Sequence, residues 1–174
     1  MIHYQDLDGK NLDLENLKTT DISIEHIATA LSHQCRFNGM IKEFYSVAQH
    51  SYLVARMLFY DYKDRKLAKC GLLHDAAEAY IGDIITQIKE KTSGIMRLEA
   101  IVLEPILKKE GISKLYIENI DLIHKYDKQL LEFEMQYFYG KASKLFDTYP
   151  SNDIVSKQLF LRNYYFYNQI EVLP

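Results

Sequence analysis

The sequence predicts an all-α fold, a single-domain bundle of about six main helices with an irregular N-terminal arm. The 174 residues include only three prolines and seven glycines, so little interrupts regular structure. Apolar residues recur at the 3.6-residue spacing of helices that bury one face. Hydrophobic residues make up 48% and charged residues 26%, which is the balance of an ordinary globular domain.

Each helix is predicted from its apolar stripe and its end signals. Residues 1–20 alternate weakly and predict an arm or a short hairpin, and Ser23 then provides an N-cap. The Asn38-Gly39 step predicts a turn, and Pro105 predicts a disturbance of the fourth helix. The predicted helices cover residues 23–34, 46–60, 64–80, 94–110, 116–139 and 151–168. Because no linker separates them, residues 1–174 are interpreted as one domain, which ends with a C-terminal helix in 140–174.

Charge and composition exclude several classes of protein. The formal charge of −3 lacks the basic surplus of a protein that binds duplex nucleic acid, although a few local cations could still hold a free nucleotide. No apolar run approaches the roughly 18 residues of a membrane span, and the N-terminus lacks the apolar region of a signal peptide. We therefore expect a cytoplasmic protein. Cys35 and Cys70 are too few for a disulfide framework or a thiolate zinc site.

Three of the predicted helices carry ionisable residues on their apolar stripes. His50 lies three residues after Val47, His74 and Asp75 directly follow two leucines, and Asp127 interrupts the stripe of the fifth helix. A buried carboxylate costs several kcal/mol unless it is paired. A lone inward histidine is more often a hydrogen-bonded core residue. Two imidazoles and two carboxylates on helices that can pack together instead favour a shared divalent cation.

Four segments that contain these residues carry a family resemblance. The strings ALSHQCRFNG, FYSVAQHS, LLHDAAEAYIGD and IHKYDKQLLEFE occur in this order. Together they resemble the HD-domain metal-dependent phosphohydrolases, and most of all the compact bacterial and phage branch related to 5′-deoxyribonucleotidases. The resemblance covers roughly residues 10–135 and implies an HD-type bundle with its metal-site helices in residues 21–139. By position, it implies one divalent metal ion (Mn, Co, Fe, Zn, Ni or Mg) held by His50, His74, Asp75 and Asp127.

The resemblance also implies roles for residues around the metal. Glu78 and Asp83 fall on positions implicated in catalysis, around the attacking water and the leaving group. Arg36 matches an arginine that holds the substrate phosphate, since its rigid fork can engage two oxygens at once. Phe37 matches an aromatic residue beside the nucleoside, and Lys89 a lysine after the Gly-Asp turn. Simpler roles remain open: Arg36 could cap a helix, and Glu78 and Lys89 could lie on a solvated surface.

The expected function is hydrolysis of a phosphate ester in a small-molecule nucleotide by metal-activated water. The simplest form is a 5′-nucleotidase acting on a (deoxy)nucleoside monophosphate. A dNTP triphosphohydrolase that releases triphosphate is the enzymatic alternative. A non-catalytic metal-containing nucleotide-binding module is the alternative from another class. The aromatic run at residues 164–167 predicts helix packing or a contact in a homo-oligomer, rather than a surface that stacks bases.

Overall fold

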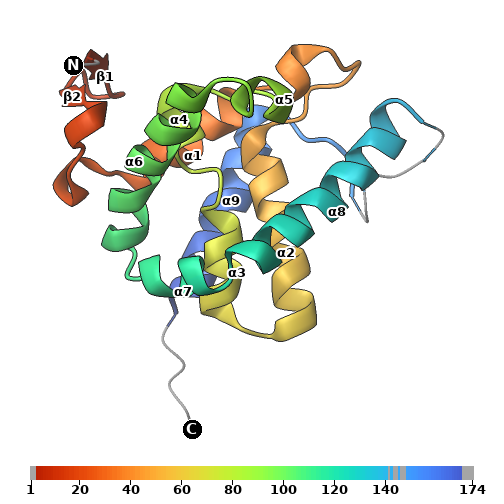
Figure 1. Cartoon of the computed structure of the whole chain (residues 1–174). Coiled ribbons are helices and arrows are strands. Elements are labelled where there is room, and N and C mark those ends of the chain that lie inside the picture. Colours follow the sequence, from red (N-terminus) through yellow and green to blue (C-terminus); the bar gives the residue numbers. More distant parts are fainter. Residues whose placement is uncertain (1–2, 141, 143–144, 146–147, 170–174) are drawn as a thin grey trace, which may run out of the picture.

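The computed structural model describes residues 3–140, 142, 145 and 148–169, and this part of the chain is predominantly helical (Figure 1). Its α-helices are α1 (Ile24–His33), α2 (Val47–Tyr62), α3 (Arg65–Leu72), α4 (Glu78–Ile81), α5 (Thr86–Lys89), α6 (Ser93–Lys109), α7 (Ser113–Glu118), α8 (Ile120–Phe138) and α9 (Asp153–Asn168). The predicted all-α fold is confirmed. Among the described helices, none is long and apolar enough to cross a membrane. Outside the described residues lie 1–2 of the predicted arm, and 141, 143–144, 146–147 and 170–174 of the predicted C-terminal segment.

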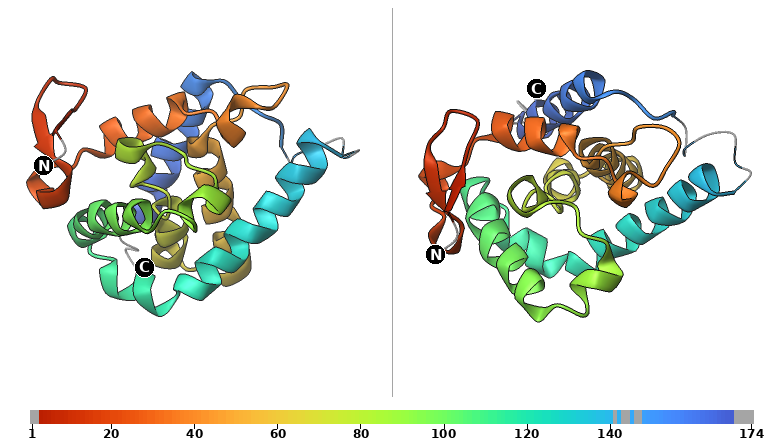
Figure 2. Two further views of the ribbon diagram at one scale, coloured as in Figure 1. Left: turned by 45° about the horizontal axis from the view of Figure 1, so that its top comes forward. Right: turned by 90° about the horizontal axis from the view of Figure 1, so that it is seen from above.

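The N-terminal arm folds as a small antiparallel hairpin followed by two 3₁₀ turns. Its elements are β1 (His3–Gln5), β2 (Asn11–Asp13), η1 (Leu14–Asn16) and η2 (Thr19–Asp21). The two 3₁₀ turns pack against α6, and the arm contributes Leu12 and Leu14 to the buried core. Figure 2 shows the hairpin at one end of the molecule, far from the C-terminal part of α8. Of the two forms that the sequence left open, the arm adopts the hairpin.

Helix α2 is the centre of the fold, and eleven of its sixteen residues are buried. It packs against α1, α3, α8 and α9, and Figure 2 shows it among these helices. Because most of its faces meet another helix, its polar side chains need partners inside the protein. Gln49 illustrates this: its amide donates to the Tyr149 carbonyl at 2.7 Å and accepts from the Ser151 backbone at 2.8 Å. These bonds tie the segment before α9 to α2.

The predicted third helix, residues 64–80, is wrong as one continuous helix. The structure ends α3 at Leu72, continues as a turn over residues 73–77, and begins α4 at Glu78. Within the turn, backbone bonds join residues three apart, as between the Ala76 amide and the Leu73 carbonyl at 3.1 Å. This tighter spacing turns the side chains of the segment in directions that a continuous helix would not allow. The segment LHDAA therefore reaches the interior from a turn.

The predicted fifth helix, residues 116–139, is two helices in the structure. Helix α7 begins before the predicted start, and the chain bends at Asn119 before α8 begins. The Asn119 side chain donates to the Leu115 carbonyl at 2.9 Å, which is the kind of local bond that competes with helix continuation. The disturbance predicted at Pro105 does not interrupt α6. Periodicity also did not predict the short helix α5.

The aromatic run at the end of α9 packs within the chain. Tyr167 is buried, and the ring of Phe166 meets that of Phe59 edge to face with centroids 5.3 Å apart. The Tyr164 hydroxyl donates to Glu110 at 3.1 Å. These contacts show that most of the run packs within the chain, whereas Tyr165 is 52% exposed.

Candidate metal centre

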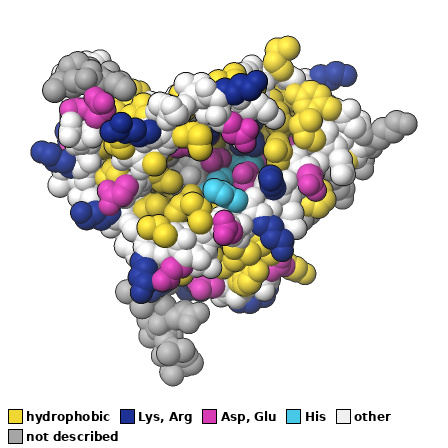
Figure 3. Space-filling model, in the orientation of Figure 1, with side chains coloured by type: hydrophobic (Ala, Val, Ile, Leu, Met, Phe, Trp, Pro, Cys, Tyr) yellow, Lys and Arg dark blue, Asp and Glu magenta, His cyan; other side chains and the backbone are white. Residues whose placement is uncertain are grey.

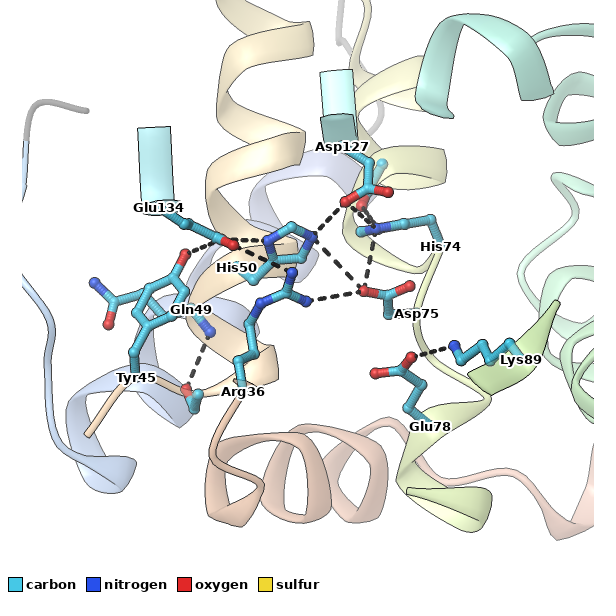
Figure 4. A network of polar contacts seen from close by, with 12 residues as sticks. Arg36, Tyr45, Gln49, His50, His74, Asp75, Glu78, Lys89, Asp127 and Glu134 are labelled. Atoms are coloured by element: carbon cyan, nitrogen blue, oxygen red, sulfur yellow. Dashed lines mark hydrogen bonds and ion pairs between the residues drawn. The ribbon is translucent and has the colours of Figure 1, made fainter. Parts of the chain in front are cut away.

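The four predicted metal ligands come from three separate segments and meet in the interior (Figure 4). His50 projects from α2, His74 and Asp75 from the turn between α3 and α4, and Asp127 from α8. His50 Nε2 lies 3.0 Å from Asp127 Oδ1 and 3.7 Å from Asp75 Oδ2. His74 Nε2 lies 3.2 Å from Asp75 Oδ2 and 3.9 Å from Asp127 Oδ1. Ligand atoms of His50, His74 and Asp75 all lie within 4.8 Å of one another. Both carboxylates therefore face both rings.

The cluster is buried on one side and open on the other. The side chain of His50 has no exposed surface, whereas that of Asp127 is 35% exposed. In the space-filling view of Figure 3, histidine and acidic side chains gather near the centre of this face. Solvent therefore reaches the cluster at Asp127, whereas the His50 ring is enclosed.

Each histidine uses one ring nitrogen for a protein contact and directs the other at the carboxylates. His74 Nδ1 donates to the Gly71 carbonyl at 2.8 Å, and since a carbonyl only accepts, this nitrogen carries the proton. His50 Nδ1 lies 2.6 Å from a carboxylate oxygen of Glu134. Both Nε2 atoms are buried, and neither has a hydrogen-bond partner among the described residues. With the proton on Nδ1 and a cation in place of the ring charge, each Nε2 would offer its lone pair beside the two carboxylates, so these residues could hold a metal ion.

The charges of the cluster depend on one another. Burial opposes the charge of Asp75, but the neighbouring His74 ring outweighs it and holds the pKa of Asp75 below its usual value. Burial likewise opposes the charge of Asp127, but the two neighbouring histidine rings hold the pKa of Asp127 far below normal. Burial lowers the pKa of His74, yet Asp75 and Asp127 raise that pKa well above its usual value. The negative charge of the two carboxylates must therefore be balanced, either by protonated histidine rings or by a divalent cation.

Glu134 is a further member of the cluster that the sequence reasoning missed. Its side chain is fully buried on α8 and contacts His50 Nδ1 at 2.6 Å, the Tyr45 hydroxyl at 2.7 Å and an Arg36 nitrogen at 3.2 Å. Burial raises its pKa, but Arg36 and His50 outweigh this and hold the pKa of Glu134 below its usual value. The available signal was its spacing, since it lies seven residues, or two helical turns, after Asp127.

Arg36 enters the cluster from the chain between α1 and α2. Its backbone amide donates to the Tyr45 carbonyl at 2.9 Å, which fixes this segment beside the start of α2. The guanidinium contacts Glu134 at 3.2 Å and Asp75 at 3.8 Å, and only 12% of the side chain is exposed. Its Nε is buried without a hydrogen-bond partner in the described part of the chain. Arg36 thus points into the cluster, so the capping role that the sequence left open does not describe it.

The residues after Arg36 form a tight left-handed loop. Phe37 has φ +57° and Asn38 has φ +52°, and Gly39 follows at φ +71°. A left-handed backbone is strained for a residue as bulky as phenylalanine. The Phe37 ring packs edge to face on Phe138 and Tyr139 at the end of α8, with centroids 5.9 and 5.8 Å away. An aromatic patch therefore adjoins the Arg36 side of the cluster.

Glu78 and Lys89 lie next to the cluster and pair with each other. Lys89 Nζ lies 2.6 Å from Glu78 and 2.9 Å from Glu99 on α6, a residue that the sequence reasoning did not select. Glu78 is only 2% exposed, and its Oε2 has no hydrogen-bond partner among the described residues. Burial, and then the charge of Asp75, raise the pKa of Glu78 to about 8 in spite of Lys89. The ion pair therefore lies in the interior. Figure 4 shows Glu78 next to Asp75.

Asp83 follows the glycine that ends α4. Gly82 adopts φ +87°, and its amide donates to the Glu78 carbonyl at 2.8 Å, so the chain turns sharply at this point. Burial raises the pKa of Asp83, while Arg36 acts in the opposite direction. Asp83 is therefore close enough to Arg36 and to Asp75 for their charges to act on it.

Together, the fold and these residues define a class of protein: a helical protein whose interior gathers two histidines and two aspartates from three segments. The family model of the HD domain matches residues 44–149, and the chain belongs to this family. The match includes all four clustered residues and also Glu78, whereas Arg36 and Phe37 precede it. Members of this family generally bind divalent metals and are phosphohydrolases.

Two curated relatives are bacterial proteins that are themselves uncharacterized. The Escherichia coli K12 protein YfdR is 36% identical over 104 residues, which are 60% of this chain and 56% of that protein. A Rhodobacter capsulatus protein is 39% identical over 87 residues, which are 48% of this chain and 44% of that protein. The chain thus spans about half the length of the curated relatives it matches.

Proposed function

We propose that this protein is a metal-dependent phosphohydrolase that acts on a nucleotide, most simply as a 5′-nucleotidase on a (deoxy)nucleoside monophosphate. One observation carries the proposal: two buried, unpartnered Nε2 atoms face two carboxylates directly beside a buried arginine. A set of nitrogen and oxygen ligands suits a divalent cation, and an arginine suits a phosphate.

The proposed ligands of the cation are His50, His74, Asp75 and Asp127. The contacts of the two Nδ1 atoms support this choice, because outer partners that fix the tautomer are typical of histidines that bind metal. A divalent ion bound there would lower the pKa of a coordinated water and polarise a phosphate oxygen. The exposed side of Asp127 gives the route by which substrate enters.

Arg36 is the proposed phosphate-binding residue. It brings positive charge to a site otherwise dominated by carboxylates, which would repel a phosphate. Its planar fork lies beside Asp75, so a phosphate next to the cation would also lie next to Arg36. The neighbouring Phe37 and its aromatic partners offer an apolar surface for the nucleoside. Lys89, which contacts Glu78, is the second positively charged side chain proposed to bind the substrate.

Glu78 is the proposed general base, and Asp83 the group that assists the leaving oxygen. A base works best when its pKa is near the operating pH, and the pKa of Glu78 is raised to about 8. Glu78 would take the proton from the attacking water, while Lys89 holds the side chain in place. The raised pKa of Asp83 suits a carboxyl that gives its proton to the departing nucleoside oxygen, which thereby becomes a hydroxyl.

The deciding experiment is a panel of nucleoside mono- and triphosphates, assayed on the full chain with Mn²⁺, Co²⁺ or Mg²⁺ and with product identification. Release of inorganic phosphate from a monophosphate is the expected result. Release of triphosphate from a dNTP would favour the alternative enzyme, and nucleotide binding without any product would favour a binding module. Asp127→Asn is the control, because it removes a proposed ligand and should abolish all turnover.

A further inference from the structure

Glu134 contacts both a proposed metal ligand, His50, and the proposed phosphate-binding residue, Arg36. It is fully buried, and an uncompensated buried charge costs several kcal/mol. Oxygen Oε1 lies 2.6 Å from His50 Nδ1 and 2.7 Å from the Tyr45 hydroxyl, whereas Oε2 lies 3.2 Å from Arg36. The two oxygens of one side chain thus serve two different neighbours (Figure 4).

The position of Glu134 on α8 places it behind the cluster. Asp127 and Glu134 are two helical turns apart, so both side chains leave α8 on the same face. Asp127 meets His50 at Nε2, and Glu134 meets the same ring at Nδ1. Two carboxylates on one face of α8 therefore contact the two nitrogens of the His50 ring.

We propose that Glu134 is a positioning residue that couples the metal site to the phosphate site. Through Oε1 it holds His50 with Nδ1 protonated and Nε2 free for the cation. Through Oε2 it holds the Arg36 fork toward the place where a phosphate would bind. The inference rests on the proposed function, because it assigns Glu134 to the metal ligand and the phosphate-binding residue of that site.

Glu134→Gln tests the proposal with little change in shape. A glutamine places an accepting oxygen at only one of the two carboxylate positions and a donating nitrogen at the other, so it loses the contact with either His50 or Arg36. Loss of an outer partner of a metal-binding histidine lowers metal affinity by about 10–100-fold. We expect a loss of this size when Mn²⁺ alone is titrated calorimetrically into the full chain. Glu134→Asp, which keeps the charge but shortens the reach, serves as the second variant if Glu134→Gln does not fold, and should also lose affinity.

Tyr45→Phe is the matched control. It removes another hydrogen bond to the same carboxylate oxygen and leaves the contacts with His50 and Arg36 in place. Its Mn²⁺ affinity should stay within about threefold of that of the wild type. A residue that supports a metal-binding histidine should instead cost at least about 10-fold in affinity. If Glu134→Gln and Glu134→Asp lose thermal stability but keep wild-type Mn²⁺ affinity, Glu134 has only a structural role. If the wild type itself binds no Mn²⁺, the proposed function fails first, and this inference fails with it.

Coupling is measured with inorganic phosphate as the probe. In Mn²⁺-saturated protein, Arg36→Ala should weaken phosphate binding strongly in the wild type and much less in the Glu134→Gln background. Such non-additivity is the signature of residues that act together. Equal losses in the two backgrounds would show that Glu134 does not position Arg36 and would overturn the coupling.

Discussion

Glu78 shows how burial changes the role that a residue can play. The sequence left open a simple ion pair between Glu78 and a lysine on a solvated face. The structure has the ion pair, with Lys89 at 2.6 Å, but in the interior. There, burial and Asp75 outweigh Lys89, and the pKa of Glu78 rises to about 8. A carboxyl with this pKa can exchange a proton near neutral pH.

Glu78→Gln should therefore lose turnover while keeping metal. The expected loss in kcat is roughly 10²–10⁴-fold, the usual contribution of a positioned acid–base group. Turnover and metal content are measured on the same preparation. Glu99→Gln is the control, since it removes the other carboxylate that contacts Lys89, and its kcat should change only a few-fold. Full activity of Glu78→Gln would refute the role, and joint loss of metal and activity would make Glu78 a ligand.

Arg36→Ala should weaken substrate binding without changing metal content at saturating metal. Loss of a charge-assisted phosphate contact costs on the order of 1.5–3 kcal/mol in kcat/KM. Steady-state kinetics on the best nucleotide, with metal analysis of the same sample, provide the test. An unchanged kcat/KM would remove Arg36 from the phosphate site.

The sequence could predict the four clustered residues but not Glu134. Each of the four is an ionisable residue at a position in an apolar stripe where a hydrophobic residue is expected. Glu134 lies in a charged stretch, DKQLLEFE, where a glutamate is ordinarily exposed. In the interior it pairs with Arg36 and Tyr45, which are 98 and 89 residues away in the chain. Only the tertiary structure brings these partners to it.

At the scale of elements, the turn at residues 73–77 depends on the close approach of α3 to α2. A Cβ on Gly71 would lie 2.5 Å from Leu58 Cδ1 and 3.3 Å from the Ala55 backbone. Leu58 is fully buried and has little room to move. The Gly71 carbonyl is also the partner of His74 Nδ1. This glycine therefore sets both the helix spacing and the orientation of a proposed ligand.

Gly71→Ala should destabilise the protein by about 1–3 kcal/mol, the usual cost of an overpacked core. Gly94→Ala is the matched control, because a Cβ there meets nothing within 4 Å at the start of α6. The control should be neutral or should gain about 0.4–1 kcal/mol, since alanine restricts the unfolded chain. Denaturant unfolding of both variants measures the difference. Equal stabilities would show that the contact between α2 and α3 accommodates the added methyl group at no cost.

The same turn explains why one predicted helix was wrong. The stretch from Asp64 to Tyr80 is predicted as continuous because it contains no proline, and its lone glycine is tolerated within a helix. The break comes from the side chain of His74, which bonds the Gly71 carbonyl that a continuous helix would use for residue 75. In contrast, α1 and α9 begin at capping residues, Ser23 and Asn152, whose signals are local. Local signals were predictable, and this tertiary bond was not.

At the scale of the whole molecule, the proposed cation would join α2, α8 and the turn between α3 and α4. A ligand that binds only the folded state stabilises it by about 2.7 kcal/mol when present at 100 times its Kd. For a chain of this length, we expect Mn²⁺ to raise Tm by roughly 5–11 °C relative to chelator-treated protein. Differential scanning calorimetry checks this. Asp127→Asn should lose the response, and an identical Tm of the wild type with and without Mn²⁺ would argue against the site.

The spread of the cluster along the chain has a consequence for biosynthesis. A ribosome makes the chain from its N-terminus, so His50, His74 and Asp75 are made long before Asp127. Until α8 is made, the two rings share a single aspartate, and the charge that balances a divalent ion is incomplete. Glu134, which contacts His50 Nδ1, is made seven residues later still. The proposed ligand set is therefore complete only once Asp127 has been made, and His50 gains its contact with Glu134 only after that.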